Sequence, residues 1–124
     1  MRQLYEGRIM DHYTDPRHAG TVDDADMSVH VENPHCGDSF TITAAVDDDT
    51  FTAIRFDGDG CALSTAAASL LLDELEGATI AAAAEIEDRD VFDMLGIQKD
   101  DIAPVRVKCV LLARNGVEEM VDDR

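Results

Sequence analysis

The chain has few positively charged and few aromatic residues. It has no tryptophan, and Lys99 and Lys108 are its only lysines. The formal net charge is −17, from 27 acidic and 10 basic side chains among 124 residues. Such a surface repels phosphate backbones, so we do not expect nucleic acid as a partner. The acidity has two open explanations: a basic protein partner, or a halophilic adaptation to a high-salt cytoplasm, which we favour because salt screens self-repulsion.

Long apolar stretches are also missing, and the cysteines cannot all pair with one another. No run of 18 apolar residues is present, and the N-terminal residues lack the apolar segment of a secretory signal. Cys36, Cys61 and Cys109 are odd in number, which excludes a complete disulfide framework. We therefore expect a cytoplasmic protein with reduced thiols and no membrane partner.

The hydrophobic pattern predicts strands in the first half of the chain. Residues 2–14 have the spacing of an amphipathic helix that ends before Asp15-Pro16. Between residues 28 and 56 the apolar side chains alternate, with a turn at Asp47-Asp48-Asp49. This alternation predicts a meander of three antiparallel strands.

The second half has a helical pattern. We expect helices within residues 62–75, 80–86, 91–95 and 105–113, separated by Gly96, Pro104 and Gly116. Strands followed by helices indicate an α+β sandwich, in which a three-stranded antiparallel sheet is packed by helices. The length predicts one domain, residues 1–124.

The segment Asn33-Pro34-His35-Cys36-Gly37-Asp38 is the first candidate for a metal-binding loop. Its proline restricts the backbone, and Gly37 can adopt a positive φ, so the segment predicts a tight turn. Such a turn lets the thiol of Cys36 and the carboxylate of Asp38 face one ion. Adjacent side chains in an extended segment point to opposite sides, which favours an outward-facing His35.

The other two cysteines also lie at expected element boundaries. Cys61 begins a predicted helix, where the helix dipole favours a thiolate. Cys109 follows Lys108, which is either a solvated helix residue or a cation that activates the thiol. Three thiolates and the Asp38 carboxylate suit tetrahedral zinc or an iron-sulfur cluster. A carboxylate holds such a metal less firmly than a fourth cysteine, which indicates a site built for exchange.

Simpler interpretations exist for each of these residues. A single cysteine is more often a small core residue, so the hypothesis depends on the whole set. Asp57-Gly58-Asp59-Gly60 is expected to be a turn, because it lacks the EF-hand spacing of a calcium loop. A structural zinc site would more often consist of cysteine and histidine alone. No motif surrounds His12, His18 and His30, which we expect to be surface or packing residues.

Four segments in this order resemble the NifU/IscU/SufU family of iron-sulfur cluster assembly proteins, over nearly the whole chain. They are the opening residues 4–17, the NPxCGD segment 33–38, the GxGCxxS segment 58–64, and Pro104-Val105-Arg106-Val107-Lys108-Cys109. The resemblance implies a SufE/NifU-like (IscU-like) fold with the cysteines at one end. It also implies a labile 2Fe-2S cluster or iron at Cys36, Asp38, Cys61 and Cys109, sulfur from a cysteine desulfurase, and transfer to apo iron-sulfur proteins.

Two roles within this family stay open. A scaffold, with Cys109 as the first sulfur acceptor, would be non-enzymatic, and IscU-type scaffolds usually carry histidine where this chain has Lys108. A SufU-type sulfurtransferase would hold zinc at the same four residues and accept sulfur at Cys36. It resembles this chain at Lys108, but its usual insertion does not fit between Cys61 and Cys109. Of the chaperone motif LPPVK only Pro104-Val105 remains, which does not favour a dedicated Hsp70-type partner.

Overall fold

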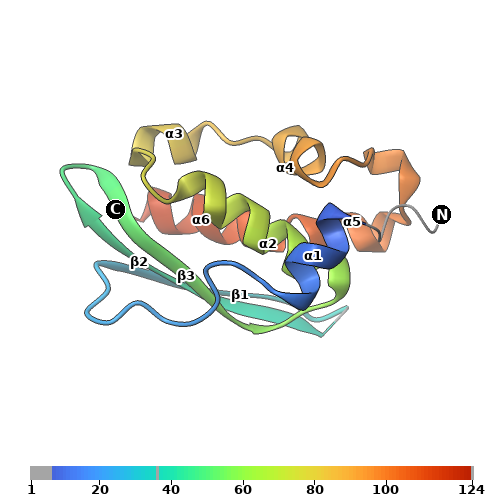
Figure 1. Cartoon of the computed structure of the whole chain (residues 1–124), viewed down its shortest axis with the longest axis horizontal. Coiled ribbons are helices and arrows are strands. Elements are labelled where there is room, and N and C mark those ends of the chain that lie inside the picture. Colours follow the sequence, from blue (N-terminus) through green and yellow to red (C-terminus); the bar gives the residue numbers. More distant parts are fainter. Residues whose placement is uncertain (1–6, 36, 124) are drawn as a thin grey trace.

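The computed structural model describes residues 7–35 and 37–123 of the chain. One helix precedes a run of three strands, and the other helices follow the strands (Figure 1). The elements are α1 (Arg8–Thr14), β1 (Met27–Asn33), β2 (Asp38–Asp47), β3 (Thr50–Asp59), α2 (Ala62–Leu75), α3 (Ile80–Ala84), α4 (Asp88–Leu95), the 3-10 helix η2 (Lys99–Asp101), α5 (Pro104–Val110) and α6 (Leu112–Asp122).

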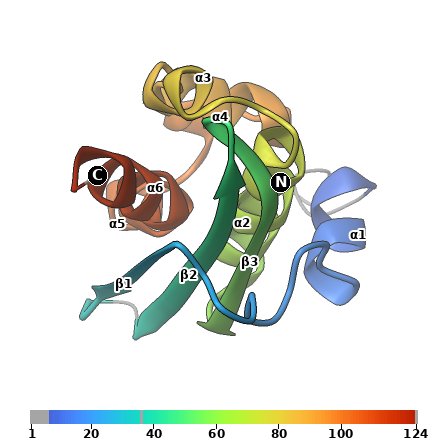
Figure 2. The same cartoon turned by 90° about the vertical axis from the view of Figure 1, so that its left-hand side faces the viewer.

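The three strands form one antiparallel sheet in the order β1-β2-β3, and α2 and α6 pack against it (Figures 1 and 2). The alternating apolar residues of β2 point toward these helices: Phe40, Ile42 and Ala44 are each at most 1% exposed. The main core joins them to side chains from the helices, among them Leu71, Leu72, Leu75, Leu112, Val117 and Met120. The predicted α+β architecture and three-stranded antiparallel meander are confirmed.

Several predicted boundaries also agree with the structure. Helix α2 covers the predicted residues 62–75, and most of its residues are buried, since the helix contacts strand β3 and the helices α1, α4, α5 and α6. The turn after β2 contains Asp48 and Asp49 at φ 52° and 59°, a conformation that aspartate tolerates better than most residues. Gly96 ends α4 in the left-handed conformation, as its predicted role as a helix breaker requires.

The prediction for the C-terminal region was wrong. The expected single helix over 105–113 is two helices, and α6 runs through Gly116 to Asp122 instead of ending near the glycine. Gly116 lies against the sheet, where an added Cβ would be 3.1–3.2 Å from side-chain atoms of Ile42 and Val31. The glycine is therefore explained by close helix-sheet packing rather than by a break in the helix.

Three smaller corrections concern other boundaries. Helix α3 ends two residues earlier than expected. Helix α4 begins at Asp88, three residues earlier, because Glu87 and Asp90 form a reciprocal capping box at its N-terminus. Residues 57–59 belong to β3 and do not form a turn, since β3 pairs with β2 as far as Ser39. Within the described residues, no helix is long and apolar enough to cross a membrane.

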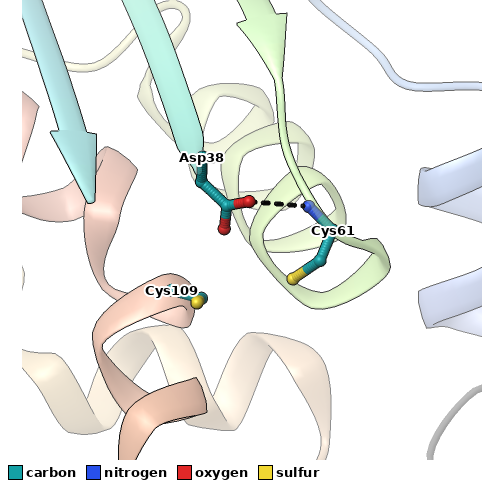
Figure 3. A group of neighbouring side chains, drawn as sticks. All are labelled: Asp38, Cys61 and Cys109. Atoms are coloured by element: carbon teal, nitrogen blue, oxygen red, sulfur yellow. Dashed lines mark hydrogen bonds between the residues drawn. The ribbon is translucent and has the colours of Figure 1, made fainter. Parts of the chain in front are cut away.

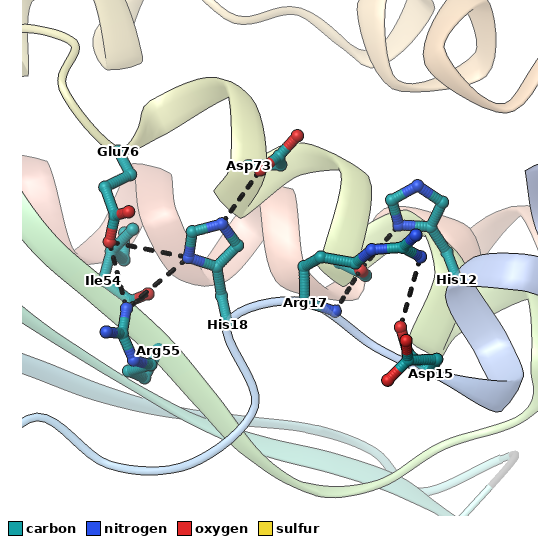
Figure 4. A network of polar contacts seen from close by, with 9 residues as sticks. His12, Asp15, Arg17, His18, Ile54, Arg55, Asp73 and Glu76 are labelled. Atoms are coloured by element: carbon teal, nitrogen blue, oxygen red, sulfur yellow. Dashed lines mark hydrogen bonds and ion pairs between the residues drawn. The ribbon is translucent and has the colours of Figure 1, made fainter.

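Helix α1 is anchored to α2 through one buried hydroxyl group. The Oγ of Ser69, whose side chain is fully buried, lies 2.7 Å from His12 Nδ1 and accepts a hydrogen bond from the Arg17 backbone N–H at 2.8 Å. A second histidine, His18, contacts Asp73 of the same helix at 3.1 Å (Figure 4). These bonds hold residues 12–18 against the C-terminal half of α2.

We predict that this anchor makes folding stability depend on pH. Partial burial, assisted by Arg17, lowers the pKa of His12 from its usual 6.5, despite the opposing carboxylates of Asp11 and Asp73. The unfolded chain therefore binds the His12 proton more tightly than the folded chain does. The contribution of His12 to the free energy of unfolding is complete above pH 6.5. It is lost as the pH falls from 6.5 through the lower pKa of the folded state.

Urea unfolding of the wild type and His12→Gln between pH 7.5 and 5.5 measures this contribution. Glutamine can still bond to Ser69 but does not titrate, so the free energy of unfolding should decrease less steeply in the variant. Equal pH slopes in the two proteins would contradict the role assigned to His12.

Candidate metal centre

The structure brings Asp38, Cys61 and Cys109 together from three separate elements. One carboxylate oxygen of Asp38 and the two sulfur atoms all lie within 4.8 Å of one another (Figure 3). Asp38 is the first residue of β2, Cys61 immediately precedes α2, and Cys109 belongs to α5. Cys36, the fourth predicted ligand, lies outside the described residues.

Asp38 has the most informative environment of the three. Its side chain is 4% exposed, and its Oδ1 accepts a hydrogen bond from the Cys61 backbone N–H at 3.2 Å. Its buried Oδ2 has no hydrogen-bond partner within the described part of the chain. An unsatisfied carboxylate oxygen is costly to bury, and a bound cation would supply the missing partner.

Cys61 is the N-cap residue of α2. Its Sγ accepts a hydrogen bond from the Ser64 backbone N–H at 3.5 Å, its thiol is free and its side chain is partly accessible. The preceding Gly60 has no room for a side chain, since a Cβ would clash with Ser64 Oγ and lie 2.7 Å from Phe40 Cζ. The Cys61 sulfur sits at the N-terminus of α2, the positive end of the helix dipole, beside a backbone N–H of the first turn.

Cys109 is almost completely buried, with 1% of its surface exposed. Its sulfur lies 3.7 Å from Asn33 Nδ2 and 3.6 Å from the carbonyl oxygen of Val105. The sulfur takes part in a disulfide bond in this structure, so it can bind a metal only after reduction. The helix α5 that carries it begins with Pro104 at its first position, which suits the start of a helix.

The structure also places two residues that the sequence left open. His35 is exposed and contributes its backbone N–H to Asn33 Oδ1 at 3.1 Å. Lys108 is exposed on α5, as the solvated alternative requires, so a role in activating Cys109 stays a prediction. Asn33 was not predicted as a site residue, because nothing in the local sequence pattern shows that its amide reaches Cys109, 76 residues further along the chain.

The donor set fits a thiophilic cation such as zinc or iron. Once Cys109 is reduced, two sulfur donors and a carboxylate converge, and the buried Asp38 Oδ2 has no competing hydrogen bond from the described residues. Asp38 is the weaker donor toward such a metal, and Cys61 is accessible from the surface. Chemically, this arrangement can hold a metal or cluster and also exchange it.

Comparison with known proteins finds relatives that match almost the full length of this chain. The zinc-dependent sulfurtransferase SufU of Bacillus subtilis is 33% identical, covering 95% of this chain and 89% of that protein. The iron-sulfur cluster assembly scaffold protein IscU 1 of Archaeoglobus fulgidus is 32% identical, covering 97% and 76%.

The fold has close counterparts among solved structures. The N-terminal part of a NifU-like protein from Brucella abortus superposes with a TM-score of 0.79 at 21% identity, covering 96% of this chain and 92% of that one. The family model of the NifU-like N terminal domain matches residues 4–123. The chain therefore belongs to the family of NifU-like N-terminal domains.

Proposed function

We propose that this protein is a scaffold for iron-sulfur cluster assembly. It receives sulfur from a cysteine desulfurase, binds iron and holds a labile 2Fe-2S cluster for transfer to apo-proteins. The observation that carries the proposal is the buried Oδ2 of Asp38, which has no hydrogen-bond partner among the described residues and belongs to a carboxylate beside two cysteine sulfur atoms. The proposed ligands are Cys36, Asp38, Cys61 and Cys109.

Sulfur enters this site by thiol exchange. A thiolate of this chain, proposed to be that of Cys109, attacks the outer sulfur of the desulfurase persulfide. A new S–S bond forms on the scaffold, the old S–S bond breaks, and the electron pair leaves with the desulfurase thiolate. The reaction needs the thiolate, which an exposed lysine beside Cys109 would favour through its charge.

The other residues hold the cargo. Cys61 accepts an N–H from the first turn of α2, which stabilises negative charge on its sulfur. The Oδ1 of Asp38 is held by its bond to the Cys61 backbone N–H, and the other oxygen, which has no hydrogen-bond partner among the described residues, points toward the space between the two sulfur atoms (Figure 3). A carboxylate at this position allows release to an acceptor.

The second candidate function is a SufU-type zinc sulfurtransferase that activates the desulfurase without building a cluster. The similarity to the Bacillus subtilis zinc-dependent sulfurtransferase and the lysine at 108 favour it. In that case zinc would be the occupant, and Cys36 would accept the sulfur. The proposed ligand residues are the same for the two candidate functions. The bound metal or cluster must therefore be measured to distinguish them.

The proposed partners are a cysteine desulfurase and apo iron-sulfur proteins. A surface with net charge −17 fits a basic docking face on the desulfurase. We place the protein in the cytoplasm, where the site thiols stay reduced.

The decisive experiment begins with protein purified without air. Its metal content is measured, and its absorption spectrum is recorded before and after incubation with iron, cysteine and a desulfurase. We expect a 2Fe-2S spectrum that disappears as an added apo-ferredoxin gains its own, and we expect Cys61→Ser to form no stable cluster. About one tightly bound zinc per chain, with no visible band and strong desulfurase activation, would favour the sulfurtransferase instead.

A further inference from the structure

Asn33 connects the parts of the metal centre. It is the last residue of β1, is 6% exposed and pairs with Asp38 across the sheet. The side-chain Oδ1 of Asn33 accepts a hydrogen bond from the His35 backbone N–H at 3.1 Å. The backbone carbonyl oxygen of Asn33 accepts one from the Gly37 backbone N–H at 2.9 Å. Its backbone and side-chain oxygen therefore shape the loop that leads into Asp38.

The other end of the same amide reaches α5. Asn33 Nδ2 donates a hydrogen bond to Cys109 Sγ over 3.7 Å, and this contact is buried. A side-chain amide has two N–H donors and one carbonyl acceptor, so one buried asparagine can satisfy the loop and the sulfur together. A hydrophobic residue of similar size could do neither.

A metal-bound thiolate makes this contact more important. A thiolate carries more negative charge than a disulfide sulfur, so it accepts a stronger hydrogen bond. The hydrogen bond withdraws electron density from the sulfur, and such bonds tune both the strength of the metal-sulfur bond and the potential of a cluster. Each residue that donates to a ligand sulfur thus affects what the site holds.

We propose that Asn33 is a positioning residue of the metal centre, which holds the Cys109 sulfur through an N–H···S hydrogen bond and weakens its electron donation to the bound metal. This role rests on the proposed function, since it requires Cys109 to be a ligand. In this role Asn33 is not itself a metal ligand. Its effect on the cargo is indirect, through the orientation and charge of the sulfur.

Nuclear magnetic resonance of the reduced wild-type protein loaded with a spin-active cadmium isotope tests the contact without mutation. We expect a proton-cadmium correlation to one side-chain amide proton of Asn33, transmitted through the hydrogen bond and sulfur. Correlations to the β-protons of Cys61 and Cys109 report direct ligation. If Cys109 shows its correlation and Asn33 shows none, the role of Asn33 is overturned. If Cys109 shows none, the proposed ligand set fails and the role of Asn33 fails with it.

Cobalt-loaded variants test the electronic effect. Asn33→Asp keeps the acceptor for His35 but loses the N–H, and Asn33→Leu loses the N–H without adding charge. With the N–H removed, the sulfur donates more readily, so the thiolate-to-cobalt charge-transfer band should move to longer wavelength in both variants.

The matched control is Asn115→Asp, which adds the same charge at an exposed asparagine of α6. Its band should equal that of the wild type. An unchanged band in both Asn33 variants at full cobalt occupancy would overturn the proposal. A shift in Asn33→Asp alone would also overturn it, because charge rather than the hydrogen bond would then be the cause. If the variants do not fold, the cadmium measurement decides.

Discussion

A 2Fe-2S cluster on the Asp38→Ala variant is expected to persist longer than on the wild type and to reach an apo-ferredoxin on the order of ten-fold more slowly, the scale of effects around metal sites. The carboxylate is the one oxygen donor among the proposed ligands and the weakest toward iron. Without this carboxylate, the acceptor protein has no weakly bound ligand to displace first when it takes over the cluster. The measurement is the rate of cluster transfer followed by circular dichroism.

Two further variants separate the explanations of this effect. Asp38→Asn keeps an oxygen that can accept the Cys61 N–H but lacks the negative charge, so it should transfer slowly as well. Asp59→Ala removes an exposed carboxylate near the same end of the sheet and should behave like the wild type. Unchanged transfer from Asp38→Ala would count against the exchange role of the carboxylate.

Gly58→Ala is expected to cause the largest loss of stability, roughly 3 to 5 kcal/mol, from a strained backbone conformation and a steric overlap together. Gly58 has φ 142°, which is unfavourable for alanine, and its Cβ would overlap the carbonyl oxygen of Ser39. Both backbones are held in the β2-β3 pair, so neither can move away cheaply. Urea unfolding of the variant measures the loss.

The matched control is Gly77→Ala. Gly77 also has a positive φ, 87°, but no atom lies within 4 Å of its added Cβ. The Gly77→Ala substitution should therefore lower the free energy of unfolding only through the strained backbone conformation, by about 1–2 kcal/mol. Equal losses in the two variants would contradict the close approach of β2 and β3 at Gly58.

The Gly58 position also matters for the metal centre. Gly58 pairs with Phe40, two residues after Asp38, and it precedes Cys61 by three. A displaced β3 would therefore move the Cys61 backbone N–H away from Asp38. We attribute the Gly-rich sequence before Cys61 to this close approach, and not to the turn that the sequence suggested.

Local patterns were reliable where one physical cause dominates. Alternation in the strands reflects a sheet with one buried face, and helix α2 is so apolar that its limits were predicted to the residue. The C-terminal helix was missed because Gly116 normally disfavours a helix, and only the neighbouring Val31 and Ile42 explain its presence there. Tertiary packing outweighed local propensity at that position.

The sequence by itself determined the fold class, the family and the set of candidate ligands, because these depend on periodicity and on short motifs whose residues are neighbours in the chain. Only the tertiary structure decided which groups meet: Asp38, Cys61 and Cys109 come from a strand, a helix N-terminus and a second helix. It also decided that one Asp38 oxygen has a hydrogen-bond partner while the other has none among residues 7–35 and 37–123, and that Asn33 reaches Cys109. Such contacts join residues far apart in the chain, and they depend on how the sheet and helices pack.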